Sequence, residues 1–198
     1  MKNEQIIANR LLSNSKYSKE WIEQALWYIL NNVLNEAFLS KFDAEQLKSI
    51  KEVIETPYAQ MLLNPEFNTT QTQLIVNVIK EGFRDDIIRT IADPEIPYQC
   101  MDYIAQGYLE GLSIPEIKDY KEFDPKQCYE ILEGFRSGIH YTSYAYPNVP
   151  APIMAMIRIA LENGYSASYN VKSKSLTITI DSVMNDEKPD DNPEDSKE

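Results

Sequence analysis

The sequence predicts a mainly α-helical fold: an array of five helix-turn-helix repeats with an N-terminal helical cap and a C-terminal β-hairpin. Three observations predict it. One pattern of residues recurs at intervals of 25 to 29 positions, its apolar members follow helical spacing, and glycine closes the predicted long helix in four of the five units. One such unit cannot bury its own apolar face, but a stack of units can.

The recurring pattern is anchored on one large apolar residue in each unit. The anchors are Phe42, Phe67, Ile96, Phe123 and Val149. Eight positions after each anchor stands an isoleucine, namely Ile50, Ile75, Ile104, Ile131 and Ile157. Fifteen positions after the anchors stand Pro57, Gly82, Gly111, Gly138 and Gly164. We therefore place the five-repeat α-helical array at residues 42–164.

Each unit carries the signals of a long helix that begins just after its anchor. The residue after three of the anchors is Asp43, Asn68 or Asp124, and these residue types are favoured N-caps. A glutamine follows three positions later, at Gln46, Gln71 and Gln127, where its side chain can complete a capping box. The glycine fifteen positions after the anchor ends the helix because it adopts the left-handed conformation without a steric penalty. A shorter helix then leads to the next unit.

Two further glycines stand inside the predicted long helices. Gly107 and Gly134 lie eleven positions after their anchors, where glycine costs about 1 kcal/mol relative to alanine. The charged residues of these helices argue against a membrane-embedded Gly-x-x-x-Gly contact. We expect each glycine to allow close approach of the next repeat's helix.

The first 41 residues predict a helical cap that differs from the repeats. Ser18 is a suitable N-cap for a helix whose apolar face runs from Trp21 to Phe38. Terminal units of helical arrays are commonly atypical. Residues 1–41 are therefore assigned to an N-terminal cap.

The last 34 residues change character. Residues 167–171 and 176–180 alternate apolar with polar side chains, which predicts a β-hairpin within residues 165–181. Because an isolated hairpin is marginal in water, it must pack on the last repeat, capture a partner strand or pair with a second copy. Homodimerisation through this hairpin is a further prediction. Residues 182–198 predict a disordered acidic tail.

Charge and cysteine content indicate the compartment and the ligands. The net charge is −12, and the tail from residue 182, with seven Asp or Glu against two Lys, supplies five of those charges. An acidic chain is unsuited to direct nucleic-acid binding. The absence of an apolar leader and of a long apolar segment predicts a cytoplasmic protein without membrane contact. We expect Cys100 and Cys128 to be reduced, buried hydrophobic residues, and we expect no metal or cofactor, because one histidine and two cysteines are too few for a zinc site.

The cadence Pro-x-Phe-Asp-x-x-Gln, Gly-x-x-x-Gly-(Ile/Leu) and Tyr-Ala-x-Pro is most complete between Glu122 and Pro147. It resembles short helical repeats of about 26 residues in poorly characterised proteins of Gram-positive bacteria and their plasmids, phages and integrative elements. The resemblance covers about residues 42–164. It implies no catalytic residues, and it implies a binding or adaptor role, including one on a mobile element.

Candidate site residues are few. The single histidine, His140, follows a predicted helix end and has no nucleophile motif nearby, so it fits a dipole contact better than catalysis. Tyrosine is more informative because it combines contact area with a polar tip and is enriched in binding hot spots. The candidate partner-binding residues are Tyr120, Tyr129, Tyr141, Tyr144 and Tyr146. Packing between short helices is the competing interpretation.

The sequence therefore predicts a non-enzymatic protein-binding or adaptor module with a protein partner. The alternative is a phage or plasmid anti-defence inhibitor that binds a nuclease or mimics nucleic acid, an interpretation that the acidic composition favours. An enzyme with a site beside His140 and the tyrosines is the third hypothesis.

Overall fold

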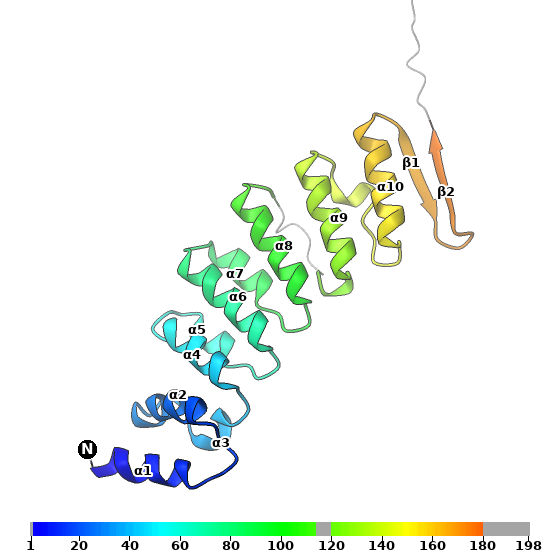
Figure 1. The fold of residues 1–198 in the computed structure, drawn as a ribbon. Coiled ribbons are helices and arrows are strands. Elements are labelled where there is room, and N and C mark those ends of the chain that lie inside the picture. The colour runs from blue at the N-terminus through cyan, green and yellow to red at the C-terminus, as the bar shows by residue number, and fades with distance from the viewer. Residues whose placement is uncertain (1, 114–119, 180–198) are drawn as a thin grey trace, which may run out of the picture.

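The computed structural model describes residues 2–113 and 120–179 (Figure 1). In these ranges the α-helices are α1 (Lys2–Leu12), α2 (Lys19–Leu30), α3 (Glu36–Leu39), α4 (Ala44–Glu52), α5 (Ala59–Leu62), α6 (Thr69–Lys80), α7 (Asp85–Ile91), α8 (Tyr98–Leu109), α9 (Pro125–Arg136) and α10 (Ala151–Glu162). The short 3-10 helices η2 (Tyr120–Glu122) and η3 (Tyr141–Ser143) and the strands β1 (Ser166–Asn170) and β2 (Ser175–Thr179) complete the described elements. The protein is mainly helical, with a C-terminal hairpin, as the sequence predicts.

The helices form an extended stack. Helices α2, α4, α6, α8, α9 and α10 lie side by side in chain order, and each contacts the next (Figure 1). The short helix α7 packs against both α6 and α8 on another side of the stack. The N-terminus lies at one end and the hairpin at the other.

One apolar core runs through the stack. It is continuous from Leu11 in α1 to Ile157 in α10. All five anchors and all five isoleucines of the sequence pattern are buried in it. The recurring apolar positions are therefore the inner face of the stack.

The helix N-termini form as the sequence predicts at three places. The side chain of Asp43 accepts from the backbone N–H of Gln46 at 2.7 Å, and the amide oxygen of Gln46 accepts from the N–H of Asp43 at 2.9 Å. The same reciprocal capping box joins Asn68 to Gln71 and Asp124 to Gln127. Three of the long helices thus begin with one geometry.

The helix C-termini also share one geometry. Gly82, Gly111, Gly138 and Gly164 have φ between +73° and +77°, the left-handed conformation expected after a helix. Asn32 adopts φ +53° after α2, and the N–H of Val33 reaches back to the carbonyl of Tyr28 at 2.9 Å, as Phe83 does to Val78 at 3.2 Å. Helix α2, which begins at the N-cap Ser18, therefore starts with a side-chain cap and ends with a left-handed residue, as α6 does.

The interior glycine of α9 has a different role from the one expected. A Cβ atom at position 134 would lie 1.8 Å from the hydroxyl oxygen of Tyr144, so the glycine makes room for this side chain. The hydroxyl donates to the carbonyl of Glu130 at 2.9 Å. The close approach comes from the residue that follows η3, not from the next long helix.

The hairpin packs on the end of the stack. Strands β1 and β2 are antiparallel, with Ser166 opposite Thr179 and Asn170 opposite Ser175, and β1 contacts α10. The strands begin one residue earlier than the sequence predicts. The predicted acidic tail lies outside the described residues. Within the described ranges, no helix is long and apolar enough to cross a membrane.

Candidate partner-binding surface

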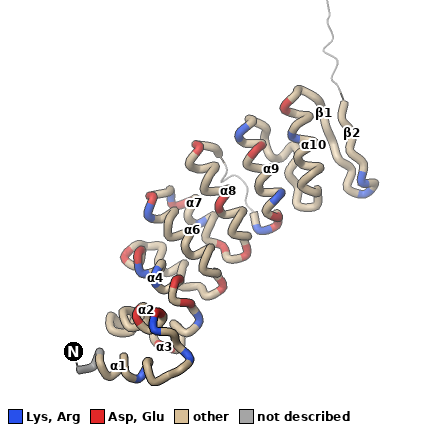
Figure 2. Tube along the Cα trace, viewed as in Figure 1, with Lys and Arg blue, Asp and Glu red and all other residues tan. Residues whose placement is uncertain are grey.

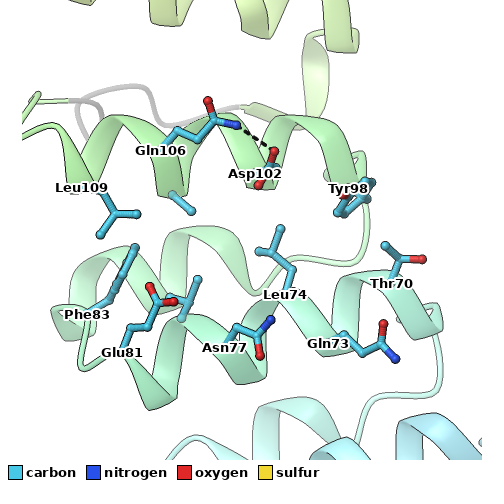
Figure 3. A pocket seen from close by; sticks show the side chains of 12 residues that line it. Thr70, Gln73, Leu74, Asn77, Glu81, Phe83, Tyr98, Asp102, Gln106 and Leu109 are labelled. Atoms are coloured by element: carbon cyan, nitrogen blue, oxygen red, sulfur yellow. Dashed lines mark hydrogen bonds between the residues drawn. The ribbon is translucent and has the colours of Figure 1, made fainter.

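A groove lies between α6 and α8 (Figure 3). Its volume is about 330 Å³. Its lining comes from Thr70, Gln73, Leu74, Asn77, Val78 and Glu81 on α6 and its C-cap, from Phe83, and from Tyr98, Asp102, Ala105, Gln106 and Leu109 on α8. The lining residues run along most of both helices.

Helical spacing sets the order of side chains along each wall. Thr70, Gln73 and Asn77 stand three and four residues apart on α6, so they share one face of the helix and all three are exposed. On the opposite wall, the amide of Gln106 donates to the carboxylate of Asp102 at 2.8 Å, which holds both side chains along α8 (Figure 3). The groove therefore offers hydroxyl, amide and carboxylate groups in sequence.

Apolar side chains are interspersed with these polar groups. Leu109 is 66% exposed and Tyr98 is 36% exposed at the two ends of the α8 wall. Phe83 is buried at the groove's C-terminal end, where its ring packs against Tyr108 with centroids 4.4 Å apart. Apolar contact area is thus available beside the hydrogen-bonding groups.

The groove continues past the N-termini of the two helices. A second hollow, of about 510 Å³, shares Thr70 and Tyr98 with the first and extends to Asn68, Pro94 and Glu95. A third, of about 370 Å³, crosses α8, α9 and α10, and its lining includes Tyr103, Lys126 and Tyr129. The rings of Tyr103 and Tyr129 lie with centroids 5.8 Å apart across the α8–α9 junction.

A side-chain hydrogen bond joins successive helices at three places. The side-chain NH₂ of Gln46 donates to the carbonyl of Phe67 at 2.7 Å, Gln71 donates to Ile96 at 2.8 Å, and Gln127 donates to Val149 at 2.8 Å. We call this contact the glutamine bridge. Each glutamine both caps its own helix and satisfies a buried carbonyl of the next unit, so one residue fixes both the helix start and the junction.

Charged side chains also connect successive units. Lys80 pairs with Glu52, Arg136 pairs with Glu110, and Arg158 pairs with Glu130. The hydrogen bond from Arg136 lowers the pKa of Glu110 below its ordinary value. The Arg158–Glu130 pair is the most buried of the three, with both side chains about one-eighth exposed. These pairs engage Glu52, Glu110 and Glu130 along the stack.

The structure divides the five candidate tyrosines. Tyr120 and Tyr144 are buried, at 3% and 1% exposed, and burial raises the pKa of both phenols. A partner cannot reach them without opening the core, so both leave the set of candidate binding residues. They fit the competing interpretation of packing between short helices.

The other three tyrosines are accessible but not gathered in one place. Tyr129 is 42% exposed and lines the α8–α10 hollow. Tyr146 is 52% exposed and donates to the carbonyl of Thr142. Tyr141 is half-buried and packs against Phe135. Of these, only Tyr129 lines one of the three hollows.

Sequence reasoning overlooked the α6–α8 groove itself. Nothing in the local sequence distinguishes Gln73 and Asn77, because single exposed amides are common on helices. Their signal is register: they stand six and ten positions after the anchor Phe67, where Asp102 and Gln106 stand after Ile96. Positions of the repeat that face outward are where a binding surface would be found.

His140 lies apart from the grooves. It is exposed, its Nδ1 lies 2.8 Å from the hydroxyl oxygen of Thr142, and its ring stacks on Tyr141. In the described part of the chain, no cluster of three or more histidine, cysteine or acidic residues could hold a metal ion.

In comparisons with known proteins, no family model, no curated protein and no solved structure matches this chain. The class that the fold defines is a mainly α-helical stack with a C-terminal hairpin. The features that bear on its function are the surface groups described above.

Proposed function

We propose that this protein is a non-enzymatic protein-binding module built on helical repeats, and that the stack from α2 to α10 is one array. The shared helix ends and the glutamine bridge support a repeated unit. The proposal extends the array to α2, since Trp21 takes the position of the bridging glutamine and donates its indole N–H to the carbonyl of Phe42 at 3.0 Å.

The α6–α8 groove is the observation that carries the proposal. Amide side chains both donate and accept hydrogen bonds, which matches the alternating N–H and C=O groups of an extended peptide. The 12 residues of α6 span about 18 Å, the length of five to six extended residues. A short extended segment of a partner protein therefore fits this site.

The charges of the groove indicate the side chains of that segment. Glu81 and Asp102 line it, Glu95 lines its continuation, and no Lys or Arg lines either hollow. Opposite charge steers association and fixes register. The partner segment is expected to carry Lys or Arg together with an apolar residue that contacts Tyr98 or Leu109.

Nucleic-acid mimicry has less support. Acidic residues alternate with Lys and Arg along the stack (Figure 2), and Glu52, Glu110 and Glu130 are engaged by basic residues of the neighbouring unit. A mimic needs a continuous negative field, because the field of the whole surface steers the partner. The anti-defence hypothesis is retained only in its form of binding a partner protein.

Selection from a display library of random heptapeptides tests the proposal. The proposal expects enrichment of peptides with basic residues, and it expects their binding to be lost in Gln73→Ala/Asn77→Ala. Binding should persist in Gln60→Ala, an exposed glutamine on α5 outside the groove. Selection of no peptide, or peptides insensitive to the groove variant, would contradict the proposal.

We also propose a homodimer through the C-terminal end. Met156 and Ile159 on α10 and Ile178 on β2 are about half exposed there, and neither strand contains an acidic residue. The strands themselves therefore add no like-charge repulsion between two negatively charged copies. Sedimentation should give twice the 22.9 kDa chain mass, and Ile178→Lys should give a monomer. A wild-type monomer at high concentration would refute the dimer.

A further inference from the structure

The junction between α8 and α9 differs from its neighbours at the third residue of its first helix. At the α4–α6, α6–α8 and α9–α10 junctions, the third residue of the first helix is a bridging glutamine, and at the α2–α4 junction it is Trp21. In α8 this position is Cys100. Its sulfur lies 3.7 Å from the carbonyl of Phe123, the group that a glutamine would bridge.

Cys100 is joined to Cys128 by a disulfide, which corrects the expectation of two reduced, isolated cysteines. Their Cα atoms lie 5.5 Å apart, and the side chains are 0% and 1% exposed. A separation of this size suits a disulfide without backbone movement. Cys128 follows Gln127, so it faces back toward α8 while Gln127 bridges forward to α10.

We propose that this cysteine pair is a redox-sensitive cross-link that replaces the glutamine bridge at the α8–α9 junction. When oxidised, the pair ties the two helices covalently. When reduced, this junction has neither the cross-link nor a side-chain amide on the Phe123 carbonyl, because a thiol is a weak donor. The redox state then sets how firmly α9 is held to α8.

The chemistry of the switch is thiol–disulfide exchange. Two protein thiols and one small-molecule disulfide, such as oxidised glutathione, give the protein disulfide and two small-molecule thiols. The protein sulfurs lose two electrons and two protons, which the cleaved disulfide takes up. Because both sulfurs are buried, exchange requires local opening of the α8–α9 junction.

The α8–α9 junction that the cross-link joins also carries part of the α8–α10 hollow. Tyr103 and Tyr129, whose rings pack across this same junction, line the α8–α10 hollow. Loosening the junction should change the spacing of these rings. The inference does not depend on the proposed function, because the junction differs whatever the array binds.

Thermal unfolding and hydrogen exchange of the purified chain, oxidised with glutathione disulfide or reduced with excess dithiothreitol, test the proposal. Reduction should lower the Tm by about 10 °C, since the cross-link closes a loop with a sequence separation of 28. Exchange should rise in α8 and α9 more than in α4 and α6. Two thiols should become reactive to alkylation only after reduction.

Two double variants separate the cross-link from packing. Cys100→Ala/Cys128→Ala should match the reduced protein and ignore redox conditions. Cys100→Gln/Cys128→Ala should also be insensitive to redox conditions. Its hydrogen exchange in α8 and α9 should be slower than in Cys100→Ala/Cys128→Ala, because the glutamine reaches the Phe123 carbonyl. If either variant fails to fold, the oxidised and reduced wild-type proteins still decide the matter. Equal Tm and exchange in both states, or a disulfide that glutathione cannot form, would overturn the proposal.

Discussion

The segments built on α6 and α9 share their helix ends and the glutamine bridge, which we call the frame, but they differ in the side chains at other positions. Both helices begin with a capping box, bridge to the next unit through glutamine, and end at a left-handed glycine. Beneath the helix, however, α6 has Val78 where α9 has Gly134 and the inserted ring of Tyr144. On the outer face, α6 presents Gln73 where α9 presents Tyr129. The frame sets the stacking, and the variable positions set packing and surface chemistry.

The largest expected loss of stability comes from disturbing the Gly134–Tyr144 contact, which is particular to α9. Gly134→Ala places a Cβ against the Tyr144 hydroxyl and should lower the free energy of unfolding by about 3 kcal/mol. Gly164→Ala, where φ is +77° but no atom lies within 4 Å, should cost only about 1 kcal/mol. Urea unfolding measures both, and equal losses would contradict the role given to Tyr144.

The next effect compares two ion pairs that connect units. Arg158→Met leaves the carboxylate of Glu130 largely buried and should cost about 2 kcal/mol. Lys80→Met breaks the exposed pair with Glu52 and should cost less than about 1 kcal/mol. If the two losses in urea unfolding were the same, burial would not distinguish these pairs.

Removing the glutamine bridge should lower stability by a similar amount at α6 and at α9. Gln71→Met and Gln127→Met keep the side-chain length but leave a buried carbonyl unpaired, which should cost about 1.5 kcal/mol each. Gln73→Met, exposed on the same face of α6 as the groove, should change stability by less than about 0.5 kcal/mol. A loss at only one of the two bridging positions would show that the units do not share this frame.

The smallest effect is on pH dependence. Arg136 lowers the pKa of Glu110, and Arg89 lowers the pKa of Asp85. A carboxylate with a lowered folded-state pKa stabilises the fold fully above its unfolded value of about 4, and this is lost as the pH falls through the folded value. Arg136→Met should therefore flatten the loss of stability below pH 4, measured by thermal unfolding. Lys126→Met should leave the change of stability with pH as it is in the wild type. If Arg136→Met also left it unchanged, the Arg136–Glu110 pair would not contribute to the pH dependence.

The sequence predicted local geometry well, because that geometry depends on residues close together in the chain. The capping boxes at Asp43, Asn68 and Asp124 and the helix ends at Gly82, Gly111, Gly138 and Gly164 are confirmed. Asn32 lies inside the segment from Trp21 to Phe38, which the apolar pattern predicts as one helix, so the end of α2 was not predicted. Asparagine tolerates the same conformation.

Contacts between units were harder to predict. The glutamine bridge, the Cys100–Cys128 disulfide and the Tyr144 contact with Gly134 each depend on which faces of two helices meet. Repeat register carries part of that information, since Cys100 and Cys128 stand four and five positions after their anchors. Register places Tyr129 six positions after its anchor, where Gln73 is also exposed, but Tyr120 stands before its anchor in a short 3-10 helix whose burial the pattern does not predict.

The α6–α8 groove as a protein-binding surface is the central claim, and one ratio tests it most directly. The dissociation constant of a selected basic peptide should be at least about tenfold higher for Gln73→Ala/Asn77→Ala than for Gln60→Ala, a loss of about 1.4 kcal/mol. Fluorescence titration at moderate ionic strength measures both constants. Equal constants for the two variants would contradict the claim.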